Sequence, residues 1–65
     1  MTNEPNPNSQ FQTGNRVRIH CPGSALHGLA GTVVNVDNTS INPYRVKLDG
    51  DLYPVWFPEQ EVRAE

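Results

Sequence analysis

Three side chains near residue 20 are of the types used in nucleophilic catalysis and in metal binding: His20, Cys21 and His27. A catalytic thiol needs a base within hydrogen-bonding reach, but neighbouring residues on a strand point to opposite faces. The spacing of the three residues also differs from the usual ligand spacings of zinc sites. We therefore expect no catalysis, no metal site and no cofactor in this chain.

A second set of informative side chains is basic. Arg16 and Arg18 flank an apolar residue, as do Arg45 and Lys47. This alternation is typical of a strand with one buried face, so all four cations should point outward from one small sheet. Such a surface is either an ordinary solvated face or a docking surface for an acidic partner. Docking of this kind is weak and salt-sensitive, because an exposed ion pair contributes only about 0–1 kcal/mol.

Charge is distributed unevenly along the chain. The formal net charge is −2, whereas nucleic-acid-binding domains are usually basic. Between residues 11 and 48 the cations outnumber a single acid, Asp37, and from Asp49 onward five acids accompany Arg63. This polarity predicts a basic face and a separate acidic face that points elsewhere.

The strands that position these side chains can be predicted from alternation and turn signals. Strands are expected over 15–20, 31–36, 44–48 and 52–57, with a very short closing strand from Val62. Because Val33 and Val36 are three residues apart, burying both requires a bulge near Val34 or Asn35. Asp49-Gly50 is a strong hairpin signal, and residues 58–61 should form one helical turn.

The predicted core and chain organisation follow from the same pattern. We expect Val17, Ile19, Tyr44, Val46 and Leu48 to point inward, and Leu26 and Leu29 to cover one end of the core. Residues 1–13 are rich in Asn and Pro and are predicted to be a disordered tail in which only Phe11 could act as an anchor. Residues 14–65 then form one all-β domain, a small five-stranded SH3-like barrel. We also expect no export signal and no membrane-spanning segment.

Four segments together resemble a known family. They are 14–19, 31–37, 44–48 and 56–62, which read GNRVRI, GTVVNVD, YRVKL and WFPEQEV. Each motif alone occurs in many SH3-like barrels, but their order and spacing resemble the SH3-like subunits of ferredoxin-dependent photosynthetic complexes. The resemblance is to the PsaE family of photosystem I and, more closely, to the NdhS family. NdhS is the SH3-like subunit of the cyanobacterial and chloroplast NAD(P)H dehydrogenase-like complex.

The resemblance implies a non-catalytic accessory subunit that helps dock ferredoxin for cyclic electron flow around photosystem I. Such a subunit is attached peripherally, through other subunits of the complex, to the cytoplasmic or stromal face of the thylakoid membrane. It carries no redox centre, in agreement with a single cysteine where an iron–sulfur cluster needs four.

Site residues follow partly from the resemblance and partly from the strand pattern. The PsaE family has a basic residue in the strand that matches 46–48, so the resemblance assigns the main ferredoxin contact to Lys47. Supporting contacts from the strand pattern are Arg45, Arg16 and Arg18. The acidic end is expected to face the parent complex, with contacts through Glu59, Glu61 and Trp56.

Two other functions remain open at this point. KOW-type barrels that bind RNA or ribosomes share the GxxVxI and GTV pattern, although they are basic throughout. A peptide-binding SH3-like module would use exposed aromatic residues, here Tyr53 and Trp56, to hold a proline-rich peptide.

Overall fold

The computed structural model describes residues 10–65. It contains five strands and one short 3₁₀ helix: β1 (Arg16–Ile19), β2 (Ala30–Val36), β3 (Tyr44–Leu48), β4 (Val55–Phe57), η1 (Glu59–Glu61) and β5 (Val62–Ala64). Residues 10–65 contain no α-helix. The first nine residues of the predicted tail lie outside the described residues.

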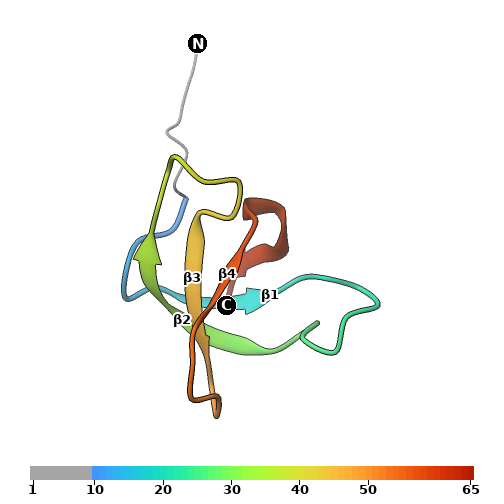
Figure 1. The fold of residues 1–65 in the computed structure, drawn as a ribbon. Coiled ribbons are helices and arrows are strands. Elements are labelled where there is room, and N and C mark those ends of the chain that lie inside the picture. The colour runs from blue at the N-terminus through green and yellow to red at the C-terminus, as the bar shows by residue number, and fades with distance from the viewer. Residues whose placement is uncertain (1–9) are drawn as a thin grey trace.

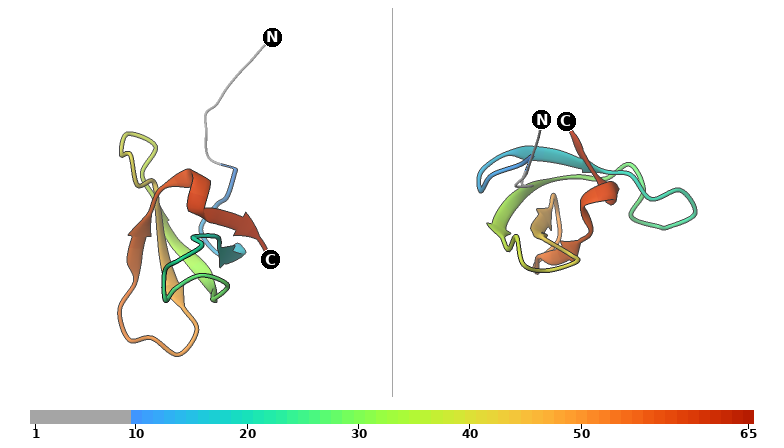
Figure 2. Two further views of the ribbon diagram at one scale, coloured as in Figure 1. Left: turned by 90° about the vertical axis from the view of Figure 1, so that its right-hand side faces the viewer. Right: turned by 90° about the horizontal axis from the view of Figure 1, so that it is seen from above.

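The strands form one antiparallel sheet in the order β4-β3-β2-β1-β5. Figure 1 labels the first four of them in chain order, β1 to β4. The sheet is strongly curved around its own inner face (Figure 2). It is not closed, because β4 and β5 each pair with only one neighbour. The chain is therefore a small β protein with two sheet edges, and the predicted closure into a barrel is absent from the hydrogen-bond pattern.

The core lies on the concave face and consists of side chains from all five strands. Eight residues are buried: Val17, Ile19, Val33, Tyr44, Val46, Leu48, Phe57 and Val62. The five inward residues predicted for the first and third strands are among them, because strict alternation places every second side chain on the same face. No charged residue is buried between residues 10 and 65.

The irregularity predicted in the second strand is confirmed. The pairing of β2 with β3 shifts register between Val33 and Asn35. Val33 is buried, and Val36 still packs against the core. One extra residue in β2 thus lets both valines reach the concave face and increases the local bend.

The centre of the sheet depends on a close approach at Gly31. Gly31 is paired with Val17 of β1 on one side and with Leu48 of β3 on the other. A Cβ atom at this position would lie 2.5 Å from the carbonyl oxygen of Lys47 and 2.9 Å from the Cα atom of Leu48. Glycine is therefore required where the three strands come together.

The fourth strand is shorter than the sequence predicted. It begins at Val55 rather than at Leu52, and the side chains of Leu52 and Tyr53 are 83% and 78% exposed. Pro54 precedes the strand and has no N–H to donate, so the ladder begins after it. Gly50 has the expected turn conformation with φ of 87°, but the chain between β3 and β4 is a wide loop instead of a two-residue hairpin.

Two smaller expectations had mixed outcomes. Leu26 packs against the core as predicted, whereas Leu29 is exposed because it follows the turn and precedes β2. The helical turn after Pro58 and the closing strand are both present.

Near the start of the described chain, the Phe11 ring packs edge-on against Tyr44 with centroids 5.5 Å apart. The backbone N–H of Gln10 also donates to the Tyr44 hydroxyl at 2.9 Å.

Candidate functional site

All five Lys and Arg residues of the chain occupy outward positions on the convex face of the sheet. Opposite residues in neighbouring strands share a face. Pairing therefore places Arg16, Thr32 and Lys47 in one row across β1, β2 and β3. Arg45 lies opposite Trp56 in β4, and Arg18 lies opposite Arg63 in β5. We call this surface the basic face.

Arg16 is the most heavily bonded cation of the basic face. Its guanidinium donates to both carboxylate oxygens of Asp49, at 2.9 and 2.6 Å, and to Oε1 of Glu65 at 3.1 Å. It also donates to the Thr32 hydroxyl at 3.0 Å. These carboxylates raise the pKa of Arg16, and the hydrogen bond from Arg16 lowers the pKa of Asp49. Arg16 therefore joins three parts of the fold and has little capacity left for a partner.

The same contacts correct the predicted separation of charge. Asp49 and Glu65 belong to the acidic end of the chain, yet both lie against Arg16 on the basic face. The reason is topological. The pairing of β5 with β1 brings Glu65 beside Arg16, and the Asp49 side chain in the turn after β3 reaches the Arg16 guanidinium. Part of the acidic end thus neutralises the basic face instead of pointing away from it.

Arg18 is tied to the loop that follows its own strand. Its Nη1 donates to the carbonyl oxygen of Gly28 at 2.6 Å, and its Nη2 lies 3.6 Å from Oε2 of Glu65. Glu65 is the carboxylate partner of Arg18, but it lies closer to Arg16, at 3.1 Å. Arg18 remains a cation at the surface, more available than Arg16.

The β3 cations differ from those of β1 in having no carboxylate partner among residues 10–65. Arg45 stacks over the Trp56 ring with its guanidinium carbon 5.9 Å from the ring centroid, and its Nη1 is 3.4 Å from Oδ1 of Asn35. Lys47 is exposed and makes no ion pair with any residue between 10 and 65. The end of β3 therefore presents an ammonium group without an ion pair beside a stacked guanidinium, and its charge contributes to lowering the pKa of nearby Asp49.

The residues expected to contact a parent complex lie on two different elements. Trp56 is on β4 and 42% exposed, beside Arg45 on the basic face. Glu59 and Glu61 are in η1, where Glu61 accepts a hydrogen bond from the Cys21 thiol at 3.6 Å. Glu61 thus has a local structural contact as well as partial exposure.

His20, Cys21 and His27 lie close together. The two imidazole rings meet edge-on with centroids 5.3 Å apart, and the backbone N–H of Cys21 donates to Nδ1 of His27 at 3.0 Å. Burial, and then the carboxylate of Glu61, raise the pKa of the Cys21 thiol. A raised pKa works against a thiolate nucleophile. Within the described part of the chain, no three His, Cys, Asp or Glu side chains are grouped in a way that could hold a metal ion.

Arg63 is the functional-site residue that sequence reasoning missed. It lies on β5 between Val62, which is buried, and Ala64, which is exposed, and it donates to the carbonyl oxygen of Gln60 at 2.9 Å. The only signal was the alternation at Val62-Arg63, which is too short to reveal that β5 pairs with β1. Asp49 and Glu65 were likewise noted only as acids, without a partner.

Two further findings complete the description of the site. Among residues 10–65, no helix has the length and apolar character needed to cross a bilayer. The chain matches no protein-family model, no curated protein and no solved structure.

Proposed function

We propose that this chain is an SH3-like module that docks an acidic protein on its basic face, and that the partner is ferredoxin. The observation that carries the proposal is the state of Lys47, an exposed ammonium group without an ion pair among residues 10–65. Arg45 lies two residues away on the same strand and face. A cation that the fold does not use is available to a partner's carboxylate.

The identity of the partner rests on the resemblance to the NdhS family. Ferredoxins of the plant type are acidic, so an unneutralised basic patch is a suitable complement. The chain then acts as an accessory subunit of a photosynthetic NAD(P)H dehydrogenase-like complex and performs no catalysis. The acids of η1, Glu59 and Glu61, are the surface assigned to the other subunits of that complex, whereas Trp56 lies beside Arg45 on the face assigned to ferredoxin.

The SH3-like assignment is supported by the connectivity. Five short antiparallel strands follow one another, and a single helical turn separates the fourth from the fifth. β1 pairs with β2 and with β5, so the chain ends beside the strand where it begins. Strong curvature of the sheet brings its concave face around one core (Figure 2).

Lys47 and Arg45 remain the first two proposed contacts, in the order expected from the sequence and the resemblance. Arg16 falls behind Arg18 in the proposal, because Asp49 and Glu65 occupy its guanidinium. Arg18 is a secondary contact at the far side of the basic face. Arg16 contributes mainly by holding β1, β3 and β5 in register.

The test is a titration of the protein with oxidised plant-type ferredoxin, followed by NMR chemical shifts. Lys47→Gln should weaken binding by up to about fivefold at low salt, since one exposed ion pair contributes up to about 1 kcal/mol. The effect should shrink as salt is added.

A matched control separates local contact from net charge. Asn38→Asp, in the exposed turn between β2 and β3, changes the net charge by the same amount as Lys47→Gln and should alter binding less. Equal weakening by both variants, or shifts that avoid β3, would contradict docking at Lys47.

A peptide-binding function is favoured by one separate observation. Tyr53 is 78% exposed and Trp56 is 42% exposed. Both belong to the segment that contains the edge strand β4. Exposed aromatic residues of this kind bind proline-rich peptides in SH3 domains. Shifts at Tyr53 and Trp56 with such a peptide, together with none with ferredoxin, would decide for this function.

A further inference from the structure

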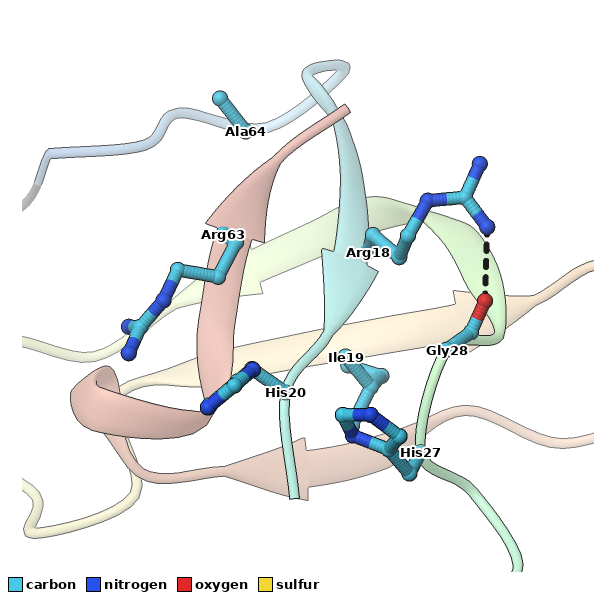
Figure 3. A pocket seen from close by; sticks show the side chains of 7 residues that line it. All are labelled: Arg18, Ile19, His20, His27, Gly28, Arg63 and Ala64. Carbon is cyan, nitrogen blue, oxygen red and sulfur yellow. Dashed lines mark hydrogen bonds between the residues drawn. The ribbon is translucent and has the colours of Figure 1, made fainter. Parts of the chain in front are cut away.

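The two sides of the basic face hold their cations in different ways. On one side, a shallow hollow of about 260 Å³ lies beside the pairing of β1 with β5. Arg18 is turned there to the Gly28 carbonyl, and the Arg63 side chain extends the opposite way (Figure 3). Because the two guanidinium groups diverge, this side offers no point at which they could meet one group of a partner.

On the other side, β2, β3 and β4 place three side chains in one row. Asn35 pairs with Arg45, and Arg45 pairs with Trp56. The guanidinium carbon of Arg45 lies 5.9 Å from the centroid of the Trp56 ring, and its Nη1 is 3.4 Å from Oδ1 of Asn35. Nε of Arg45 is buried without a hydrogen-bond partner among residues 10–65. The guanidinium is therefore contacted by an aromatic ring on one side and by an amide on the other.

Trp56 keeps a large apolar surface exposed in spite of this contact. It is 42% exposed and lies on the edge strand β4, which pairs only with β3. A tryptophan side chain can bury about 150–250 Å², and apolar surface in contact with water is unfavourable. The segments between residues 10 and 65 leave this part of the ring uncovered, so it is available to a partner.

The ring adjoins the two cations that lack carboxylate partners. Arg45 contacts it directly, and Lys47 lies two residues further along β3 on the same face. Neither cation forms an ion pair within the described part of the chain. Aromatic residues and Arg are enriched at the cores of protein interfaces, and Trp and Arg are frequent hot spots. A protein surface with carboxylates around an apolar side chain would complement this arrangement.

We propose that Trp56 is the apolar anchor of the docking surface, with Arg45 and Lys47 as its charged neighbours. The partner contributes an apolar side chain that packs on the indole ring and carboxylates that meet the two cations. The inference rests on the proposed docking of ferredoxin, and it assigns Trp56 to that interface instead of to a parent complex. Salt separates the two parts of the interface, because it screens exposed ion pairs but does not weaken the burial of apolar surface.

The first experiment follows the indole Nε1–H signal of the ¹⁵N-labelled chain during titration with unlabelled oxidised plant-type ferredoxin. Trp56 is the only tryptophan of the chain, so the signal identifies itself without a variant. A saturable shift is expected, with the same midpoint as the shift of the Lys47 backbone signal. Shifts at Lys47 with an unmoved indole signal would overturn the anchor and leave the docking intact. No shift at any residue would overturn both.

A ring-deleting variant tests the salt dependence. Trp56→Thr keeps a β-branched residue that suits a strand. It should weaken binding by about tenfold, and this factor should stay nearly constant as salt is added, whereas the smaller effect of Lys47→Gln should shrink. An effect of Trp56→Thr that disappears with salt would contradict an apolar anchor.

Tyr53→Thr is the matched control for Trp56→Thr. Tyr53 is also an exposed aromatic residue, 78% exposed, but it lies in the loop before β4. Its replacement should leave binding unchanged, and a loss equal to that of Trp56→Thr would contradict a specific role of Trp56. Trp56→Phe retains a smaller ring and a strand-forming residue, so its affinity should lie between those of the wild type and Trp56→Thr. An affinity of Trp56→Phe as low as that of Trp56→Thr would count against packing on the ring.

A double-variant cycle separates contact with the partner from positioning of Arg45. A ring that only holds Arg45 in place has no effect on binding once Arg45→Gln is present. Direct contact predicts that most of the tenfold loss from Trp56→Thr remains in the Arg45→Gln background. Disappearance of the loss in that background would overturn the anchor and reduce Trp56 to a support for Arg45.

Discussion

Strands β1 and β3 carry the same sequence pattern, a valine between two cations, but the fold treats the two pairs of cations differently. On β1, Arg16 holds two carboxylates and Arg18 holds the Gly28 carbonyl. On β3, Arg45 rests on the Trp56 ring and Lys47 has no ion pair among residues 10–65. Both pairs point outward from neighbouring parts of one sheet.

The comparison shows that strand alternation determines which face of the sheet a side chain occupies. It does not determine whether that side chain is bonded within the fold or remains available to a partner. The β1 cations are opposite β5 and close to the turn after β3, where acids from the end of the chain can reach them. The β3 cations are opposite β2 and β4, whose outward residues, Thr32, Asn35 and Trp56, carry no charge. Structural cations and available cations are thus separated by what the neighbouring strands present.

The largest expected effect comes from breaking the connection between the two strands. Gly31 stands between Val17 of β1 and Leu48 of β3, and Gly31→Ala would place a Cβ 2.5 Å from the Lys47 carbonyl oxygen. Overpacking of this kind lowers the free energy of unfolding by about 1–3 kcal/mol. Urea denaturation measures the loss, and backbone NMR shifts should spread over β1, β2 and β3.

Gly50→Ala is the matched control for that substitution. Gly50 has φ of 87°, and a Cβ there would have no atom within 4 Å. Its cost of about 1–2 kcal/mol comes from the left-handed conformation alone, so its shifts should stay within the turn. Shifts from Gly31→Ala that remain as local as those of Gly50→Ala would show that the three strands are not coupled through this position.

A smaller effect separates the two kinds of cation directly. Arg16→Gln removes the partner of Asp49 and Glu65 and should lower the urea midpoint, by less than Gly31→Ala does. Lys47→Gln should leave the midpoint nearly unchanged, because no ion pair between residues 10 and 65 is lost. Equal midpoints for the two variants would remove the distinction between structural and available cations.

Where local patterns determine the structure, the sequence predicted it well. Alternation identified the buried residues of β1 and β3, and the three-residue spacing of Val33 and Val36 predicted the register shift in β2. The Pro58 turn and the closing strand were also predictable from residue type. In each case the deciding interactions lie within a few residues along the chain.

What the sequence did not reveal depends on contacts between distant residues. Arg16 is 33 residues from Asp49 and 49 from Glu65, and no local signal indicates that these charges meet. The pairing of Arg18 with Arg63, and the hollow beside it, require the register of β1 with β5. The late start of β4 reflects Pro54 within a stretch that otherwise reads as a strand.

The smallest expected effect is a change in the pH dependence of stability, because it reports on a single carboxylate, that of Asp49, which is bonded to Arg16 of β1. Arg16 lowers the pKa of Asp49 below its ordinary value of 3.8. A lowered pKa in the folded state gives stability that is complete above the unfolded pKa and is lost as pH falls through the folded pKa. The protein should therefore lose stability between about pH 5 and pH 2, and Arg16→Gln should lose less. Asp37, whose pKa is lowered by Thr39, contributes equally to both proteins and cancels in the difference. Urea midpoints measured across this range provide that difference, and parallel curves for the two proteins would show that the Arg16–Asp49 pair does not stabilise the fold.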